Sequence, residues 1–241
     1  MIKNNLANYV TCLNLLCGCL SILYSLRIDL QMAAVFIILA GVFDFFDGFV
    51  ARLVQTKSII GKDLDSLADV VSFGVAPGFI VFALFYYNIR FVGIDYDPFK
   101  NWFSFAAFLL PVCSAWRLAK FNNDTRQTDG FIGMPVPSMG YIVAGLPFIL
   151  YQGNTPEWLS DFLLHPITLL FLIALLCYLM LSEIPLLSLK FKTYGFKENM
   201  PRYMVVITGA VLLAVLQLKA MPLIIIAYIL ISLFSRKEEA A

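Results

Sequence analysis

Eight apolar segments follow one another along this chain of 241 residues, and they limit its fold more than any other feature. Apolar stretches of roughly 17 to 25 residues are long enough to cross a hydrocarbon layer of about 30 Å as α-helices. With 61% hydrophobic and 14% charged residues, a chain of this size could not hide its apolar surface in a soluble core. The sequence therefore predicts an all-α polytopic membrane protein, with one integral membrane domain over residues 1–241.

The boundaries of the expected spans follow from the apolar runs. In chain order they are 9–26, 30–53, 65–87, 102–121, 134–151, 162–183, 202–218 and 221–234. Only Lys219 and Ala220 separate the last two segments, which could form two helices, one bent helix or a re-entrant pair. The first run lacks a small-residue cleavage site, so we expect it to be retained as a span.

Positive residues predict the orientation, because Lys and Arg flanking a span are retained on the cytoplasmic side. Of the 17 Lys and Arg residues, all but four fall on one face of the eight-span arrangement. The four exceptions are Arg27, Arg90, Lys100 and Lys219. Both termini are therefore expected to be cytoplasmic.

Four carboxylates lie near the cytoplasmic ends of the second and third spans. Asp44 and Asp47 stand in the apolar run GVFDFFDGFVARL, although a carboxylate at the centre of a membrane helix costs about 2.5 to 3.5 kcal/mol and less near its ends. Asp65 and Asp69 open the third span. Spacings of three and four residues place each pair on one face of its helix. The short loop between the spans makes them antiparallel neighbours, so we expect all four acids to converge.

This acidic cluster predicts a divalent-metal site. Like charges crowded together repel one another and take up protons unless a cation neutralises them. Oxygen ligands suit Mg²⁺, Mn²⁺ or Ca²⁺ rather than zinc, and no His or Cys lies nearby. The alternative is that the acids are solvated or paired with Arg52, Lys57 and Lys62. It explains poorly why Asp44 lies more than two turns inside Arg52 in an apolar run.

Small residues accompany the acids. Gly48 and Ala51 follow Asp47, and Gly61 precedes Asp65, so a bulky ligand could approach the helix backbone closely. Small residues in membranes more often serve tight helix packing. Beside four acids, they indicate a platform for a ligand.

Together these residues form D-x-x-D-G-x-x-A-R and, eight residues later, G-x-x-x-D-x-x-x-D over positions 44–69. This pattern resembles the signature of the CDP-alcohol phosphotransferase family. Further stretches resemble its phosphatidylserine synthase branch, which usually has proline where Ala7 stands here. They are NYVTCLNLLCG (8–18), DSLADVVSFGVAP (65–77), RLAKFN (117–122) and FIGMPVPS (131–138). The resemblance covers residues 1–140.

The resemblance implies a role for each acid. Asp44, Asp47, Asp65 and Asp69 would bind divalent metal, expected to be two Mg²⁺ or Mn²⁺ ions, with Ca²⁺ as a non-productive occupant. Asp69 would also act as the general base. The implied reaction transfers a phosphatidyl group from CDP-diacylglycerol to the hydroxyl of L-serine, releasing CMP and forming phosphatidylserine by in-line displacement.

The resemblance also suggests substrate contacts near the acids. Gly48, Ala51 and Gly61 would let the cytidine and phosphates lie against the helices. Arg52 would meet a phosphate or a carboxylate, with topological anchoring as an equal alternative.

Polar residues of the first and fourth spans are further candidates. Asn8, Thr11 and Asn14 recur at helical spacing and would contact the nucleotide or the aspartates, unless they serve interhelical hydrogen bonding. Arg117 and Lys120 would hold the serine carboxylate, with topological anchoring as the competing explanation.

Two other polar residues are expected to lie outside the site. Asp63 is expected to cap a helix rather than bind metal. His165, the only histidine, is expected to be a non-catalytic loop residue.

Two other functions remain open from the sequence. Another CDP-alcohol phosphotransferase would use glycerol phosphate, inositol phosphate or an archaeal lipid with the same aspartates. A divalent-cation transporter would instead line a path with its carboxylates. For the favoured function we expect a homodimer in the cell membrane, an active site at the cytoplasmic face, and no nucleic-acid partner.

Overall fold

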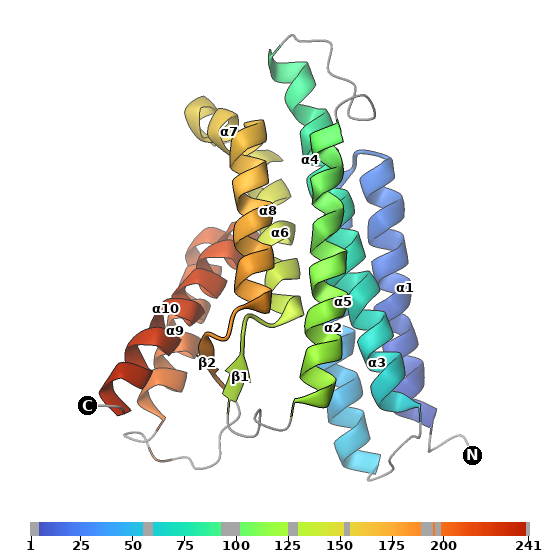
Figure 1. Ribbon diagram of the computed structural model, residues 1–241, viewed down its shortest axis with the longest axis vertical. Coiled ribbons are helices and arrows are strands. Elements are labelled where there is room, and N and C mark those ends of the chain that lie inside the picture. Colours follow the sequence, from blue (N-terminus) through green and yellow to red (C-terminus); the bar gives the residue numbers. More distant parts are fainter. Residues whose placement is uncertain are drawn as a thin grey trace.

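The computed structural model of the chain describes residues 5–54, 60–92, 102–124, 130–151, 155–188, 195 and 199–239. Over these residues the fold is a bundle of helices with one short antiparallel sheet (Figure 1). The strands β1 (Gly130–Ile132) and β2 (Pro185–Leu187) contribute only three residues each. The expected helical membrane fold is therefore confirmed.

The first two helices form an antiparallel pair in which α1 (Leu6–Leu26) turns its polar face inward against α2 (Leu30–Val54). The buried residues of α1 are Asn8, Thr11, Asn14, Cys17, Gly18, Ser21 and Ser25. Its exposed positions include several leucines. Lipid favours this pattern, because it solvates leucine as well as a protein core does but offers polar groups no hydrogen-bond partner. The distribution on α1 therefore fits a membrane span.

The third span is one continuous stretch made of α3 (Gly61–Asp69), the π-helix η2 (Val70–Val75) and α4 (Ala76–Val92). It begins one turn before the expected residue 65. Its portion Gly61–Tyr86 is the most deeply buried of the candidate spans, so it forms the centre of the bundle.

Neighbouring helices approach η2 closely. A Cβ atom on Gly18 of α1 would lie only 2.8 Å from the Cα of Ser72, and one on Gly74 would lie 3.0 Å from the Cβ of Ser114 in α5 (Leu109–Asn123). The 3₁₀-helix η3 (Trp102–Phe108) leads into α5 and completes the fourth span. The π-helix is thus enclosed on both sides by backbone contacts that only small residues allow.

The sixth span departs from the expectation of one helix over 162–183. It consists of α7 (Glu157–Leu164) and α8 (Pro166–Leu181), which meet at 61°. His165 between them has an extended backbone, because a residue that precedes proline is sterically disfavoured in the helical region. Its Nδ1 accepts a hydrogen bond from the backbone N–H of Ile167 at 3.4 Å, so the imidazole caps α8.

The last two segments fold back on each other. α9 (Met200–Leu216) and α10 (Met221–Glu239) are joined by the 3₁₀ turn η4 (Gln217–Ala220), whose first residue has a positive φ of 54°. A Cβ on Gly209 of α9 would lie 3.6 Å from the side chain of Ile224 in α10. This contact excludes a single bent helix, one of the three expected arrangements.

Five stretches of the described chain are long and apolar enough to cross a membrane, and α7 with α8 would add a sixth. The fifth stretch, Met200–Ser235, contains the whole α9–α10 hairpin, and α6 (Val136–Tyr151), with 16 residues, is slightly shorter than a full span. The expected eight apolar segments are thus all helical, but they differ in how far each could reach across a membrane.

The two ends of the chain lie at the same end of the bundle, on opposite sides of it (Figure 1). The start of α1, the end of α2, the start of α3 and the end of α10 are found at one end of the molecule, here called the α2–α3 end (Figure 1). This agrees with two termini on one side of the membrane, and the charge distribution predicts that side to be cytoplasmic. Two of the basic residues named in the sequence analysis lie outside the described residues. They are Lys57, a possible partner of the acids, and Lys100, one of the four expected on the non-cytoplasmic face.

Candidate metal and substrate site

Three of the four predicted metal ligands meet at the α2–α3 end. One carboxylate oxygen from each of Asp44, Asp47 and Asp65 lies within 4.8 Å of the others. Asp47 is buried, and the other two are half-buried. α1 contacts both α2 and α3, and the carboxylates of these two helices converge, as the spacing predicted.

The donor set fits a hard divalent cation. Oδ1 of Asp65 is buried and has no hydrogen-bond partner among the described residues. A buried carboxylate oxygen without a partner is costly, and a cation would satisfy it. Carboxylate oxygens are the ligands that Mg²⁺ and Mn²⁺ prefer. The three acids could therefore hold a divalent ion.

Asp69 lies beside this group rather than within it. Its carboxylate is 8% exposed and interacts electrostatically with Asp44, Asp65 and Asp47. Its Oδ1 accepts a hydrogen bond from the side-chain amide of Asn14 at 3.3 Å. One oxygen is thus held by a neutral donor, and the other could face a ligand.

Two polar residues of α1 form hydrogen bonds with the acids. The Thr11 hydroxyl lies 2.6 Å from Oδ2 of Asp47 and 3.1 Å from the carbonyl of Ala7, and the shorter contact is the one to the acid. Asn14 holds Asp69 as described above, whereas Asn8 donates to the side chain of Asn5 at 3.3 Å. The structure therefore places Thr11 and Asn14 on the aspartates, one of the two roles suggested by their spacing.

The π-helix begins directly after Asp69. Its wider turn interrupts the regular helix register between the acid-bearing α3 and the buried α4. The Ser72 hydroxyl donates to the backbone carbonyl of Asn14 at 2.9 Å. The same residue of α1 is thus bonded to α3 through its side chain and to η2 through its backbone.

The glycine beside Asp47 differs from those that pack helices together. Among the described residues, a Cβ on Gly48 would meet only Nη1 of Arg52, at 3.9 Å, which is an ordinary contact distance. Helix packing therefore does not explain this glycine, and the space above it is open to a ligand. Arg52 is exposed at the rim of that space, and Ala51 is half-buried on the same helix. Gly61 is half-buried at the start of α3.

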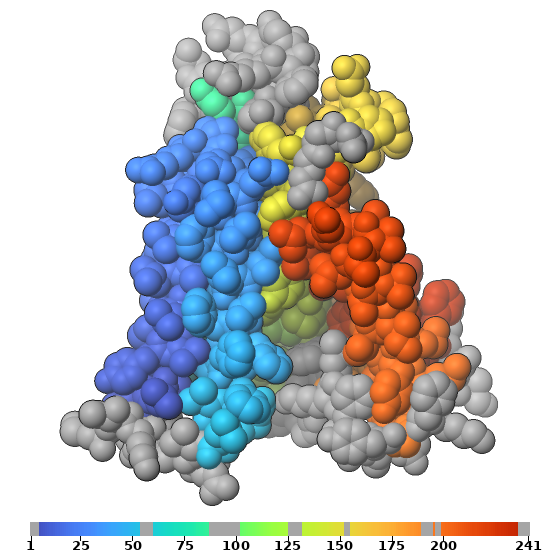
Figure 2. All heavy atoms as spheres, turned by 180° about the vertical axis from the view of Figure 1, so that it is seen from behind, coloured from blue at the N-terminus to red at the C-terminus, as the bar shows by residue number. Residues whose placement is uncertain are grey.

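The outer surface is hollowed on the face that α2 shares with the α9–α10 hairpin. Figure 2 shows α6 lying deep between α2 and the hairpin, so that α6 forms the floor of the hollow. The lower part of α2 in this view, where the acids are found, borders the hollow.

Arg117 is the predicted acceptor residue that the structure brings to the site. Its side chain is 6% exposed and interacts electrostatically with Asp69 and with Tyr228 of α10. Its Cζ lies 4.8 Å from the ring centroid of Phe121, a cation–π contact. Among the described residues, its Nε and Nη2 have no hydrogen-bond partner. A buried guanidinium with two unpaired donor atoms could bind an anion.

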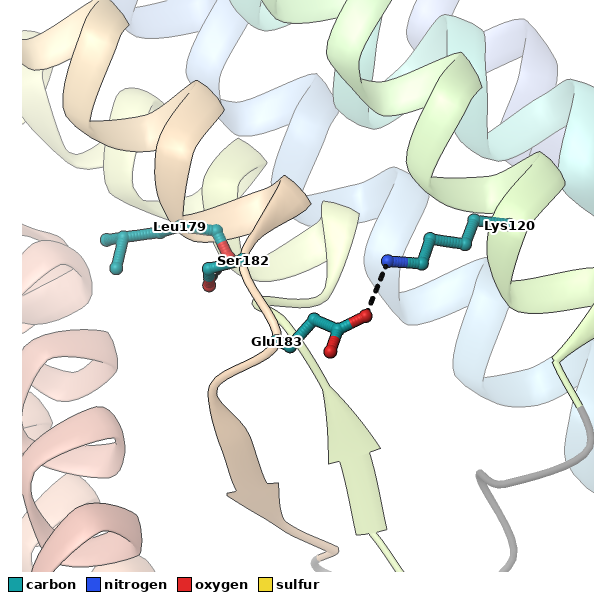
Figure 3. A network of polar contacts seen from close by, with 4 residues as sticks. All are labelled: Lys120, Leu179, Ser182 and Glu183. Atoms are coloured by element: carbon teal, nitrogen blue, oxygen red, sulfur yellow. Dashed lines mark hydrogen bonds and ion pairs between the residues drawn. The ribbon is translucent and has the colours of Figure 1, made fainter.

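Lys120 does not share this position. It is exposed and pairs through Nζ with Oε1 of Glu183 at 3.2 Å (Figure 3). The pair links α5 to the segment after α8, and it is a surface ion pair of small energetic value. The structure therefore does not bring Lys120 together with Arg117, although the two had been predicted to act jointly.

Two tyrosines near the site had no signal in the sequence. The hydroxyl of Tyr141, on α6, occupies the space that a side chain at Gly41 would need, and it is an electrostatic neighbour of Asp44 and Asp69. Tyr228 lies next to Arg117 and donates to the Leu187 carbonyl at 2.7 Å. Both come from helices whose apolar pattern gives no hint of a site.

Asp63 is exposed in the first turn of α3, where the helix N-cap is Ile60 and no side chain caps the helix. The expected capping bond is therefore absent at this helix end. A negative charge in a first turn still interacts favourably with the helix dipole. Among the described residues, Asp63 is not one of the acids whose carboxylate oxygens converge.

Comparison with known proteins agrees with this geometry. Residues 4–236 match the family described as CDP-alcohol phosphatidyltransferase. The chain is 36% identical over 145 residues to a Bacillus subtilis protein named CDP-diacylglycerol–serine O-phosphatidyltransferase, a match that covers 58% of this chain and 76% of the relative. It is 38% identical over 200 residues to a Saccharomyces cerevisiae protein of the same name, covering 72% and 67% respectively.

An archaeal relative extends the comparison. An archaetidylserine synthase of Methanothermobacter thermautotrophicus is 36% identical over 134 residues, covering 55% of this chain and 53% of the relative. The match of residues 4–236 includes the acids of α2 and α3 as well as Arg117. The chain therefore belongs to the CDP-alcohol phosphatidyltransferase family.

Proposed function

We propose that this protein transfers a phosphatidyl group from CDP-diacylglycerol to the hydroxyl of L-serine. The serine oxygen forms a bond to the phosphorus that bears diacylglycerol, the bond from that phosphorus to CMP breaks, and the products are phosphatidylserine and CMP. Relatives named for this reaction support the proposal. The observation that carries it is the buried Arg117, whose free donors lie near Asp69.

Arg117 favours a carboxylate-bearing acceptor over a phosphorylated one. Among the residues that the structure describes, Arg117 is the only buried cation. One guanidinium matches the single charge of a carboxylate and can bind it through two donors. Glycerol phosphate and inositol phosphate carry about two negative charges, which would call for more than one cation. A single buried arginine therefore favours serine over the two phosphorylated acceptors.

Asp69 is proposed as the general base. It interacts electrostatically with the acid group and with Arg117, so an acceptor whose carboxylate binds Arg117 would direct its hydroxyl toward Asp69. The Asn14 amide holds Oδ1, which leaves Oδ2 to take the proton as the new ester bond forms. Asp69 could also contribute an oxygen to metal binding, as the family signature suggests.

Asp44, Asp47 and Asp65 are proposed to hold divalent metal, as two Mg²⁺ or Mn²⁺ ions together with Asp69. Bound there, the metal would neutralise the pyrophosphate and the charge that develops on the departing CMP. Thr11 keeps Asp47 in place by its hydrogen bond. The open space above Gly48, with Arg52 at its rim, would receive the cytidine and phosphates.

The assembly and location of the protein belong to the same proposal. We place the α2–α3 end at the cytoplasmic face, where serine and CMP are soluble, and we propose a homodimer as the active form. Chemical crosslinking in membranes, followed by denaturing electrophoresis, should give a species of twice the 27.1 kDa chain mass. A monomer alone would remove the dimer from the proposal.

An acceptor screen tests the function. Purified protein is incubated with CDP-diacylglycerol, Mn²⁺ or Mg²⁺, and one of serine, glycerol phosphate or inositol phosphate, and CMP and the lipid product are measured. CMP release with serine is expected; release with a phosphorylated acceptor alone would overturn the assignment. Adding chelator should stop turnover, and adding Mn²⁺ back should restore it.

The donor lipid is a second variable, because one relative is named for archaetidylserine synthesis. Repeating the serine assay with a CDP-activated ether lipid separates the two donors. A higher kcat/KM for the ether lipid would change the donor and leave the serine acceptor in place.

Asp69→Asn tests the general base. The variant keeps the volume and one oxygen but cannot take a proton at neutral pH, so turnover should be lost while CDP-lipid still binds. Asp63→Asn is the matched control, because Asp63 is an exposed acid of the same helix. Full activity of Asp69→Asn would remove Asp69 as the base.

A further inference from the structure

Asn122, near the end of α5, is bonded to α3 through both its side chain and its backbone. Its Nδ2 donates to Oγ of Ser66 at 2.8 Å, and its carbonyl accepts from Nζ of Lys62 at 2.9 Å. The Ser66 hydroxyl in turn donates to the Lys62 carbonyl at 3.1 Å. These three residues form a closed link between the two helices, here called the Asn122 clasp.

The clasp joins the two halves of the proposed site. Ser66 directly follows Asp65 on α3, and Asp69 stands one turn later on the same helix. Arg117 is on α5, five residues before Asn122. One helix thus carries acids for the metal and the base, and the other carries the cation for the acceptor. Their relative position decides whether both substrates can react.

Arg117 lies between two points at which α5 is held. The first is the close packing of Ser114 against Gly74 of η2, where a Cβ on the glycine would lie 3.0 Å away. The second is the clasp, eight residues further along, or about 12 Å at 1.5 Å per helical residue. Without the clasp, the last two turns of α5 would lose their hydrogen bonds to α3, and only the contact with η2 would hold this part of the helix.

We propose that Asn122 is a positioning residue for the acceptor, which holds Arg117 in register with Asp69 through the clasp. This inference rests on the proposed function. An acceptor must place its carboxylate on Arg117 and its hydroxyl at Asp69 at the same time, so a shift of α5 along α3 separates the two contacts. Asn122 acts through the helices and touches no reacting atom. The CDP-lipid, bound on α2 and α3, depends less on the clasp.

The chain offers a matched control at the next position. Asn123 is exposed, and its Nδ2 donates to the Ala119 carbonyl of its own helix at 2.8 Å. Asn123→Ala removes the same chemical group from the same helix end without touching α3. A general effect of losing an asparagine at the end of α5 would therefore appear in both variants.

Kinetics of four variants test the proposal: Asn122→Ala, Ser66→Ala, the double variant and Asn123→Ala. The KM for serine should rise on the order of threefold to tenfold in Asn122→Ala, the range that one net hydrogen bond supports, while the KM for CDP-diacylglycerol stays within about twofold. The double variant should be no worse than the more affected single variant, because both changes break one link. Asn123→Ala should behave as wild type.

Other outcomes would overturn the clasp. These are equal rises in both KM values, additive effects of the two changes, or the same kinetics for Asn122→Ala and Asn123→Ala. If Asn122→Ala does not fold, as judged by its thermal unfolding, the serine KM of Ser66→Ala decides. Wild type that releases CMP only with another acceptor would refute the proposed function instead, and the clasp is then tested on the KM for that acceptor.

Discussion

Burial of the Arg117 guanidinium costs free energy, and the same burial prepares it to bind an anion. A guanidinium in a membrane protein interior is expensive unless its charge and its donors are satisfied. Asp69 and the Phe121 ring offset part of the charge, but Nε and Nη2 remain without a partner among the described residues. An anionic ligand would supply what the protein leaves open, so the cost is consistent with binding.

Replacing Arg117 should therefore act on the acceptor. In Arg117→Ala the KM for serine should rise on the order of tenfold to a hundredfold, and more than the KM for CDP-diacylglycerol, because a charge-assisted pair to the carboxylate is lost. Steady-state kinetics with each substrate varied in turn measure both values. Lys120→Ala is the control, since its surface pair with Glu183 contributes little. Similar changes in both KM values for Arg117→Ala would indicate a structural role.

At Gly48, in contrast, the packing of the protein does not require a glycine. Within the described part of the chain, a Cβ there would meet only Arg52 at 3.9 Å, whereas at Gly18 it would collide with backbone. In a helix interior, alanine is favoured over glycine by about 1 kcal/mol. Selection of glycine at this position on stability alone is therefore unexpected.

Gly48→Ala should separate stability from binding. The unfolding temperature should stay the same or rise, while the KM for CDP-diacylglycerol should rise on the order of tenfold because the added methyl group occupies the ligand's space. Gly209→Ala is the control, a helical glycine of the α9–α10 hairpin whose Cβ would also find room, at 3.6 Å from Ile224. An unchanged KM for CDP-lipid in Gly48→Ala would show that no ligand approaches this backbone.

At the scale of elements, the sequence predicted the helices and the facing of the acids, because both follow from spacing along the chain. The i, i+3 and i, i+4 pairs placed Asp44 with Asp47 and Asp65 with Asp69, and one short loop brought the pairs together. The roles of Thr11 and Asn14 could not be chosen from spacing. They depend on how α1 crosses two other helices, and spacing within a helix does not determine its crossing angle.

The π-helix and the two tyrosines were not predictable for a related reason. A π-turn has no composition of its own, and η2 reads as part of an ordinary apolar span. Tyr141 and Tyr228 lie in helices where an aromatic residue is unremarkable until its neighbours are known. The break at His165 is different, since the following proline was visible and the expected span simply crossed it.

The close contact between Gly18 of α1 and Ser72 of η2 should be sensitive to a larger side chain. Gly18→Ala would place a methyl carbon 2.8 Å from the Cα of Ser72, so the two elements must separate. Overpacking of this kind costs about 1 to 3 kcal/mol, and Asn14, one turn away, would lose its bonds to Asp69 and η2. Both the unfolding temperature and kcat should fall, whereas Gly209→Ala should lower neither. Wild-type kcat in Gly18→Ala would show that α1 does not hold the acids.

The molecule as a whole is asymmetric in the chemistry of its two ends. The first turn of α1 and the last turn of α10 lie at the α2–α3 end, while the α1–α2 turn lies at the opposite end (Figure 1). The acids are in the C-terminal half of α2 and in α3. All but four of the 17 basic residues are expected on the first side. A reaction that takes a soluble acceptor and releases CMP needs its site at the cytoplasmic surface. The proposed function therefore requires the α2–α3 end to face the cytoplasm.

Labelling of single cysteines tests the orientation. After the five native cysteines are replaced, a membrane-impermeant maleimide is applied to Arg27→Cys in the α1–α2 turn and to Asp63→Cys in the first turn of α3, both exposed positions. In right-side-out vesicles only Arg27→Cys should react, and in inverted vesicles only Asp63→Cys, because basic flanks are retained in the cytoplasm. Solubilised protein should react at both positions, which controls for buried thiols. The reverse pattern would place the acids on the outer face, away from the cytoplasmic supply of serine, and would contradict both the orientation and the proposed location of the site.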